Sequence, residues 1–327
     1  MRRPRLLRPA LAASALLLAG CGLATSGGAV PSADLAGPLE DAPSLDGAEI
    51  AVGSKNFTEQ ILLGKIALIV LKAAGAEVTD LTNIPGSASS REAHLNGDID
   101  AMWEYTGTGW LVYNAKPKPI KDQQKQYEAV RDLDLAENDL VWLPPAPMNN
   151  TYAFAVTQEN AKKYGISKMS EIAEKVPPAE RTFCVESEFK DRNDGLQGML
   201  KTYDIPLGQP KGVPDKNIQT YQTGAIYDAT AKGECLFGEV FTTDGRIVAL
   251  DLSVLEDDRG YFPNYNVCLV LTDELAEEHP EIEDLITPIT EKLTNEVLLQ
   301  LNARVDVDGK EPAQVAEEWL RDEGFIS

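Results

Sequence analysis

The sequence predicts an α/β protein with two lobes and a helical tail. Strand and helix signals alternate in a βαβαβ order from residue 48 to residue 105, and a second alternation begins near residue 150. The tail after residue 273 has the apolar spacing of helices. The 327 residues, 43% of them hydrophobic, suffice for two domains of ordinary size. We expect one lobe over 48–149 and 266–327, and the other over 150–265.

The first alternation predicts a mostly parallel sheet. Its strands are expected at AEIAVG (48–53), GAEVTDLT (75–82) and IDAMWEY (99–105). Helices are expected from about Phe57 to Gly75 and over SASSREAHLN (87–96). Asn56 and Glu59 are expected to form a capping-box-like pair at the start of the first helix.

The second alternation predicts further strands separated by short helices. The strand signals are NTYAFAVT (150–157), RTFCVE (181–186), ECLFGEVF (234–241), VALDLSVLEDD (248–258) and NYNVCLVLT (264–272). Each carries β-branched or aromatic residues between turn-forming residues.

The N-terminus predicts export. Four arginines precede the short apolar run LAASALLLAG (11–20), as in a signal peptide. The stretch from Leu18 to Cys21 resembles a bacterial lipobox, which implies lipid attachment at Cys21; an ordinary signal peptide with a chance cysteine is the alternative. Residues 21–47 are rich in Gly, Ala, Ser and Pro and predict a flexible linker. The protein is then expected on the outer face of the cytoplasmic membrane.

Charge excludes one class of partner. The chain has a formal net charge of −22, and removing a signal peptide with four arginines makes it more negative. Such a chain is repelled by nucleic acid and by anionic lipid surfaces. We expect a monomer with no nucleic-acid partner.

Three cysteines remain after Cys21, and each lies in a strand-like run. We expect a disulfide between Cys184 and Cys235, because both belong to the same expected lobe, with Cys268 as a buried free thiol. Three unpaired core cysteines are the alternative.

Catalytic and metal-binding motifs are absent from the sequence. It has no HExxH, CxxC or GxSxG motif, and its two histidines, His94 and His279, are expected at the surface. We therefore expect no catalytic residue, metal or cofactor.

Aromatic residues and single cations occur instead where strands end. Ligands of open α/β sheets bind outside the carboxyl ends of strands, so these residues are expected to converge on one crevice. The stretches are GSKNFTEQ (53–60), EYTGTGW (104–110), MNNTYAF (148–154), ESEFKDRNDG (186–195), EVFTTDGRI (239–247) and YFPNYNV (261–267). Trp103 and Trp110 flank the second stretch and are expected in the core or at the rim.

In this order, the stretches resemble the substrate-binding proteins of ABC importers for glycine betaine, carnitine, choline and related osmolytes. The resemblance covers about residues 48–327. It implies a bilobed type II periplasmic-binding-protein fold that closes over its ligand. It also implies an ABC permease and its cytoplasmic ATPase as partners.

The resemblance further implies an aromatic box for a quaternary ammonium and polar partners for a carboxylate. By motif, the box consists of Tyr105, Tyr152, Phe241 and Tyr265. The carboxylate partners are Lys55, Thr108 and Arg192. Phe241 stands where a tyrosine is usual; it keeps an aromatic face but lacks the hydroxyl group.

Physical chemistry supports this assignment. A trimethylammonium group donates no conventional hydrogen bond, and an aromatic face offers it cation attraction and apolar contact together. Lys55 and Arg192 favour a ligand with an anionic end, hence betaine-like zwitterions over choline, although Arg192 could instead pair with Glu186 or Glu188. A choline or amino-acid receptor of the same fold and, less favoured, an exported lipoprotein enzyme are the alternatives.

Overall fold

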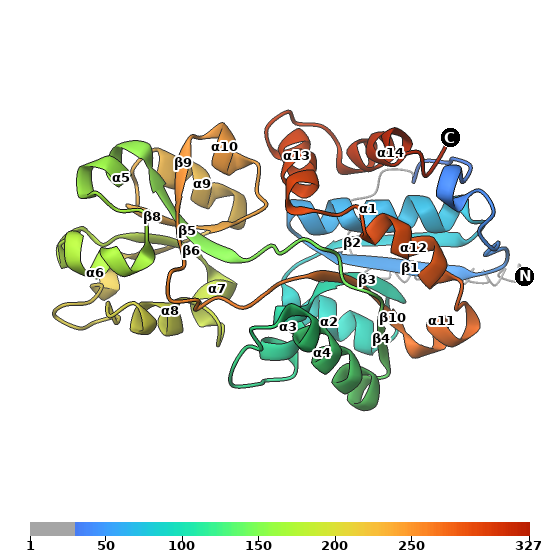
Figure 1. Ribbon diagram of the computed structural model, residues 1–327, viewed down its shortest axis with the longest axis horizontal. Coiled ribbons are helices and arrows are strands. Elements are labelled where there is room, and N and C mark those ends of the chain that lie inside the picture. The colour runs from blue at the N-terminus through green and yellow to red at the C-terminus, as the bar shows by residue number, and fades with distance from the viewer. Residues whose placement is uncertain (1–29) are drawn as a thin grey trace, which may run out of the picture.

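The computed structural model describes residues 30–327 and shows two lobes joined by two extended segments (Figure 1). Each lobe is built on a five-stranded sheet flanked by helices. Lobe 1 contains β1–β4 and β10, and lobe 2 contains β5–β9, so the chain crosses between the lobes twice. This is the bilobed α/β architecture expected from the sequence. The predicted signal peptide and Cys21 lie outside the described residues.

Lobe 1 has the strand order β2-β1-β3-β10-β4. Its strands are β1 (Glu49–Lys55), β2 (Glu77–Ile84), β3 (Ala101–Tyr105), β4 (Leu140–Trp142) and β10 (Val267–Thr272). β1 runs parallel to β2 and β3, whereas β10 runs antiparallel to β3 and β4. The three strands predicted over residues 48–105 are parallel to one another, as expected, whereas the later strand β10 makes the whole sheet mixed. The reason is that β10 enters the sheet on the return crossing from lobe 2 and opposes its neighbours.

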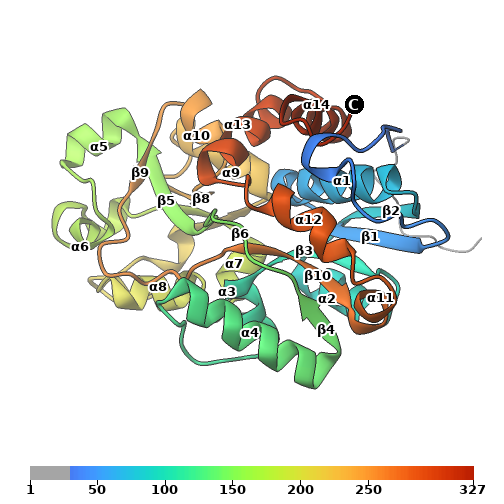
Figure 2. The same ribbon diagram turned by 45° about the vertical axis from the view of Figure 1, so that its right-hand side comes forward.

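Helix α1 forms the centre of lobe 1. It is buried along most of its length between the sheet and the C-terminal helices α12 to α14 (Figure 2). This burial explains why its sequence is apolar on every face. The helices of lobe 1 are α1 (Thr58–Ala73), α2 (Ser87–Leu95), α3 (Thr106–Thr108), α4 (Gln123–Asn138), α11 (Asp273–Glu278), α12 (Ile282–Thr290), α13 (Asn295–Asp306) and α14 (Pro312–Asp322).

Lobe 2 has the strand order β7-β6-β8-β5-β9. Its strands are β5 (Tyr152–Thr157), β6 (Phe183–Glu186), β7 (Ile218–Tyr221), β8 (Phe237–Phe241) and β9 (Leu252–Leu255), and the expected strand over 248–258 is shortened to β9. Its helices are α5 (Gln158–Tyr164), α6 (Ile172–Lys175), α7 (Ser187–Asp191), α8 (Leu196–Thr202), α9 (Thr223–Ala231) and α10 (Arg246–Ala249). Along β5, alternate residues face opposite cores: Ala153 packs with Tyr227 of α9, whereas Phe154 packs with Phe183.

A disulfide joins Cys184 in β6 to Cys235, which precedes β8. The two Cα atoms lie 5.6 Å apart, and 51 residues separate the cysteines in the sequence. Cys268 is a buried free cysteine. This arrangement matches the pairing expected from the sequence.

The segment before β1 is docked on lobe 1. Leu39 and Leu45 are each 1% exposed, and Leu45 donates its backbone N–H to the carbonyl of Ala74 (2.7 Å). Leu35 forms a β-bridge with Ile326. The prediction of a flexible linker over 21–47 is therefore wrong for residues 30–47, because a few leucines in this segment complete the lobe 1 core.

The prediction that His94 lies at the surface is wrong, because this residue lies in the interior. It is 2% exposed at the end of α2, and burial lowers the pKa of its imidazole to about 4. Within residues 30–327, no helix has the length and apolar character needed to cross a bilayer.

Candidate functional site

The seven residues predicted to bind a ligand all line one cavity. Lys55, Tyr105 and Thr108 come from lobe 1, and Tyr152, Arg192 and Phe241 come from lobe 2. Tyr265 lies on the second crossing segment, between β9 and β10. Residues far apart in the sequence therefore meet between the lobes.

The ends of strands place the aromatic side chains. Tyr105 is the last residue of β3, and Tyr152 opens β5. Phe241 ends β8 and is the register partner of Tyr152 in the antiparallel pair, so the two rings lie 5.2 Å apart between centroids. Tyr265 meets Tyr152 edge to face at 5.5 Å.

The crossing segments hold Tyr265 in place. Its backbone N–H donates to Asn149 Oδ1 (2.7 Å), and its carbonyl accepts from the N–H of Asn150 (3.3 Å). The two crossings are therefore tied to each other directly beside the cavity.

Phe57 is an aromatic cavity residue that the sequence analysis missed. Its ring stacks 5.4 Å from Phe241 and 6.2 Å from Tyr105. It follows directly on Lys55 and Asn56 in GSKNFTEQ, and that proximity was the available signal. The cavity has five aromatic walls rather than four.

Lys55 lines the cavity but already has a charged partner. Its ammonium donates to Glu104 Oε1 at 2.6 Å, and both side chains are almost fully buried. The same ammonium lies 5.3 Å from the centroid of the Tyr105 ring. The second acceptor oxygen of Glu104 is held by the Tyr113 hydroxyl (2.6 Å).

Arg192 is likewise paired. Nε and Nη2 donate to the two oxygens of Asp194, both at 2.7 Å, and Nη1 donates to Glu188 (3.2 Å). Although burial alone would raise the pKa of the Asp194 carboxyl, the hydrogen bonds and the charge of Arg192 outweigh it and lower that pKa. The Tyr265 hydroxyl also donates to Asp194 (2.5 Å).

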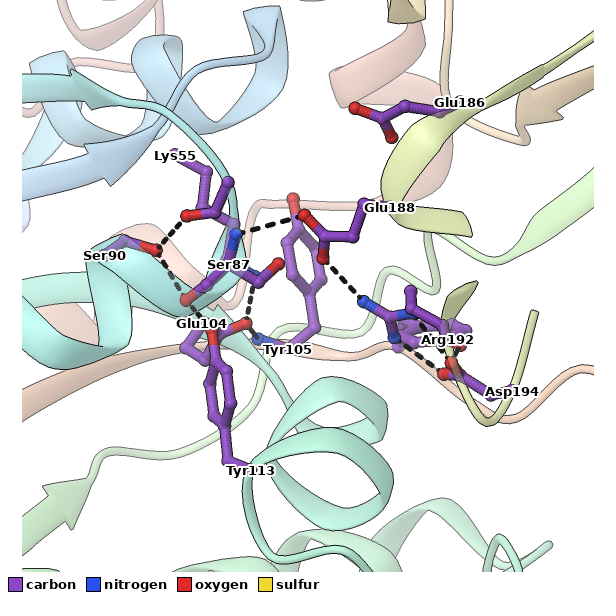
Figure 3. A network of polar contacts seen from close by, with 12 residues as sticks. Lys55, Ser87, Ser90, Glu104, Tyr105, Tyr113, Glu186, Glu188, Arg192 and Asp194 are labelled. Atoms are coloured by element: carbon purple, nitrogen blue, oxygen red, sulfur yellow. Dashed lines mark hydrogen bonds and ion pairs between the residues drawn. The ribbon is translucent and has the colours of Figure 1, made fainter. Parts of the chain in front are cut away.

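Two acids of lobe 2, Glu186 and Glu188, also line the cavity (Figure 3). Glu188 Oε2 accepts the backbone N–H of Ser87 (3.1 Å) at the start of α2, so it links the lobes. Burial raises the pKa of the Glu186 carboxyl. From the sequence, both acids were predicted only as possible partners of Arg192, because the contact of Glu188 with lobe 1 is long-range and leaves no local pattern.

Glu59 lies buried behind the cavity. Its Oε1 accepts from the Tyr105 hydroxyl (2.7 Å) and from Asn150 Nδ2 (2.8 Å). Its Oε2 accepts from the Thr243 hydroxyl (2.6 Å) and from Asn302 Nδ2 (3.1 Å). The expected capping role is wrong: the N-cap of α1 is Phe57, which has no side-chain cap, and Asn56 instead accepts from the N–H of Gly86.

The two tryptophans that flank the Tyr105 stretch do not contribute to the cavity. Trp103 is fully buried and Trp110 half-buried, and neither lines the cavity. Within the part of the chain that the structure describes, no three His, Cys, Asp or Glu side chains are grouped to hold a metal ion.

Comparison with known proteins decides the family. Residues 48–322 match the family described as the substrate binding domain of the ABC-type glycine betaine transport system. The chain belongs to this family. A glycine-betaine-binding protein of Pseudomonas aeruginosa is 37% identical over 284 residues, which cover 85% of this chain and 88% of the relative.

Other members of the glycine betaine transport family are also similar. The carnitine transport binding protein OpuCC of Listeria monocytogenes is 31% identical over 290 residues, covering 87% of this chain and 91% of OpuCC. A crystal structure of a glycine betaine/carnitine/choline ABC transporter protein superposes with a TM-score of 0.68 at 30% identity, covering 84% of this chain and 98% of that one. The family match includes every residue that lines the cavity. The protein is thus a substrate-binding component of an ABC transporter.

Proposed function

We propose that this protein captures a betaine-type quaternary amine, such as glycine betaine, proline betaine or carnitine, in the cavity between its lobes. One observation carries the proposal: aromatic rings from both lobes and from a crossing segment line the same cavity as a lysine, an arginine and a threonine. The cationic head would lie among Tyr105, Tyr152, Phe241 and Tyr265. The anionic end would lie at Lys55, Thr108 and Arg192.

Aromatic faces suit a methylated ammonium because they attract a cation without needing a hydrogen bond. Each desolvated face contributes roughly 1–2 kcal/mol. Four faces and one charge-assisted carboxylate contact can supply the roughly 8 kcal/mol of micromolar binding after the costs of association. Phe241 supplies an aromatic face but no hydroxyl group. We therefore expect it to bind the cation more weakly than the tyrosine that is usual at this position, without a change of ligand class.

The pairing of Lys55 and Arg192 with acids leaves both able to bind a carboxylate. An ammonium has three donors and a guanidinium five, and the hydrogen bonds to the neighbouring acids use one donor of Lys55 and three of Arg192. Their acidic partners hold the remaining donors at the cavity wall. A ligand carboxylate would add to these contacts and would not need to break them.

In the cell, we infer, the protein is exported, lipid-anchored at Cys21 on the outer face of the cytoplasmic membrane, and monomeric. It would deliver its ligand unchanged to a permease with a cytoplasmic ATPase, with no chemistry of its own. A turnover assay under saturating betaine tests the last point, since any product would favour an enzyme.

Isothermal titration calorimetry with glycine betaine, proline betaine, carnitine, ectoine and choline tests the ligand class. We expect betaines to bind at micromolar concentrations and choline, which lacks a carboxylate, at least tenfold more weakly, the worth of one charge-assisted contact. If no quaternary amine binds to the folded protein, the proposed ligand class is wrong. If choline binds as tightly as glycine betaine, then Lys55 and Arg192 do not contribute to affinity by binding a ligand carboxylate.

A further inference from the structure

Glu59 combines full burial, four hydrogen-bond donors and the lack of a cation. It is 3% exposed, and its donors come from lobe 1, from lobe 2 and from the first crossing segment. Among residues 30–327, no lysine, arginine or histidine forms an ion pair with it. A lone buried carboxylate is costly, so its place directly behind a cavity wall calls for an explanation.

The donors favour the ionised carboxylate. An ionised carboxylate only accepts hydrogen bonds and has about four acceptor sites, and here all four are used. Two of the donors are amide nitrogens, and the orientation of Asn302 is fixed because its Nδ2 also donates to the carbonyl of Thr243 (3.0 Å). Burial raises the pKa of this carboxyl above its usual value, and the four hydrogen bonds limit that rise without cancelling it.

The other buried carboxylates near the cavity differ from Glu59. Glu239 accepts one backbone N–H, from Glu186 (2.7 Å), and burial raises its pKa well above the usual range. Asp194 also accepts a hydroxyl from a cavity tyrosine, but the guanidinium of Arg192 balances its charge. Of the three buried acids Glu59, Glu239 and Asp194, Glu59 therefore has all four acceptor sites occupied by hydrogen-bond donors and no cation paired with it.

We propose that Glu59 is the buried counter-charge for the quaternary ammonium of the ligand and acts on it through Tyr105. This inference rests on the proposed function and names a residue that sets its selectivity for cations. By accepting a hydrogen bond from the Tyr105 hydroxyl (2.7 Å), the carboxylate increases the electron density of the ring that lines the cavity. The electric field of the Glu59 carboxylate also reaches the ammonium across that ring. Because the carboxylate lies behind the ring, the methyl groups of the ligand still contact the apolar aromatic face.

The test compares two ligands of the same shape. Glycine betaine carries a quaternary nitrogen, and 3,3-dimethylbutanoate carries a neutral carbon at the same position, with the same carboxylate. Both are titrated into the wild-type protein and the Glu59→Gln variant by calorimetry, with displacement titrations for the weaker ligand. Glu77→Gln is the matched control: it removes the same charge from an exposed position at the start of β2.

A unit charge roughly 8 Å from the ammonium, at an effective dielectric constant near 20, corresponds to about a ten- to thirtyfold change in affinity. We expect Glu59→Gln to weaken glycine betaine by about that factor and 3,3-dimethylbutanoate by less than about threefold. Glu77→Gln should change neither affinity. A purely structural role of Glu59 would weaken both ligands alike, and that result, or no change for either, overturns the proposal.

Tyr105→Phe provides an independent test if Glu59→Gln does not fold. It keeps the ring and the carboxylate but removes the hydrogen bond between them. Glycine betaine should lose about two- to fivefold more affinity than the neutral isostere, and equal losses overturn the proposal. If the wild-type protein binds no quaternary amine, the proposed function itself fails and the counter-charge fails with it. A wild-type protein that binds betaine while both variants treat the two ligands alike refutes the counter-charge alone.

Discussion

Replacement of Lys55 by methionine separates its structural role from its role in binding. Lys55 and Glu104 are 4% and 2% exposed, and the substitution leaves the carboxylate buried without its cation. Breaking such a pair costs about 3–5 kcal/mol. Glu104 keeps two donors, the Tyr113 hydroxyl and the backbone N–H of Tyr105, so we expect the lower end, about 3 kcal/mol.

At about 2–4 °C per kcal/mol for the unfolding of a lobe of roughly 150–250 residues, Lys55→Met should lower the melting temperature of lobe 1 by roughly 6–12 °C. The double variant Lys55→Met/Glu104→Gln should regain most of that loss, because neither charge is then left alone. It should not regain affinity for glycine betaine, since the ligand carboxylate still lacks the ammonium. Thermal unfolding followed by circular dichroism and calorimetric titration measure the two effects separately.

Lys162→Met is the control, because Lys162 is exposed on α5. It should change neither quantity. A Lys55→Met variant as stable as the wild type would refute the buried-pair argument. A double variant with wild-type affinity would show that Lys55 serves the fold and not the ligand.

Three further predictions concern stability. A variant with alanine at both Cys184 and Cys235 should lose about 4 kcal/mol, the loop-closure value for a separation of 51 residues, and an unchanged urea midpoint would contradict this. A chain that begins at residue 48 should be less stable than one that begins at residue 30 by about 3–6 kcal/mol, because the burial of Leu39 and Leu45 is lost; equal midpoints would show that the segment is dispensable. Because the pKa of Asp194 is lower in the folded protein than in the unfolded chain, its contribution is complete above about pH 4 and is lost as pH falls through the folded value. Acid unfolding of Asp194→Asn should accordingly be less steep below pH 4 than that of the wild type, and parallel curves would remove Asp194 from this role.

The sequence predicted the cavity residues well because strand ends position them. Tyr105, Tyr152 and Phe241 each stand at the end or start of a strand, where the chain direction alone places a side chain at the edge of the sheet. The resemblance to a family then told which of these aromatic residues to choose. All seven predicted ligand residues line the cavity.

The missed features depend on contacts that local patterns do not contain. Glu59 satisfies a capping pattern, so nothing in its local sequence indicates donors from Thr243 and Asn302, which lie about 180 and 240 residues away. The docking of residues 30–47 depends on a few leucines among Gly and Pro, too few for any periodicity. The mixed sheets follow from the order in which the chain crosses between lobes, and that order is a tertiary property.

The charges around the cavity explain why the predicted cations are paired. A lysine or arginine buried without an anion would cost several kcal/mol whenever the cleft holds no carboxylate ligand. Glu104 and Asp194 remove that cost while leaving donors at the wall. The ligand carboxylate then meets two cations whose charges are already balanced by Glu104, Asp194 and Glu188, so it gains hydrogen bonds but little long-range attraction. The ammonium end instead meets aromatic faces backed by Glu59. Discrimination among quaternary amines should therefore depend on the fit of the anionic end, whereas affinity for the class depends on the cationic end.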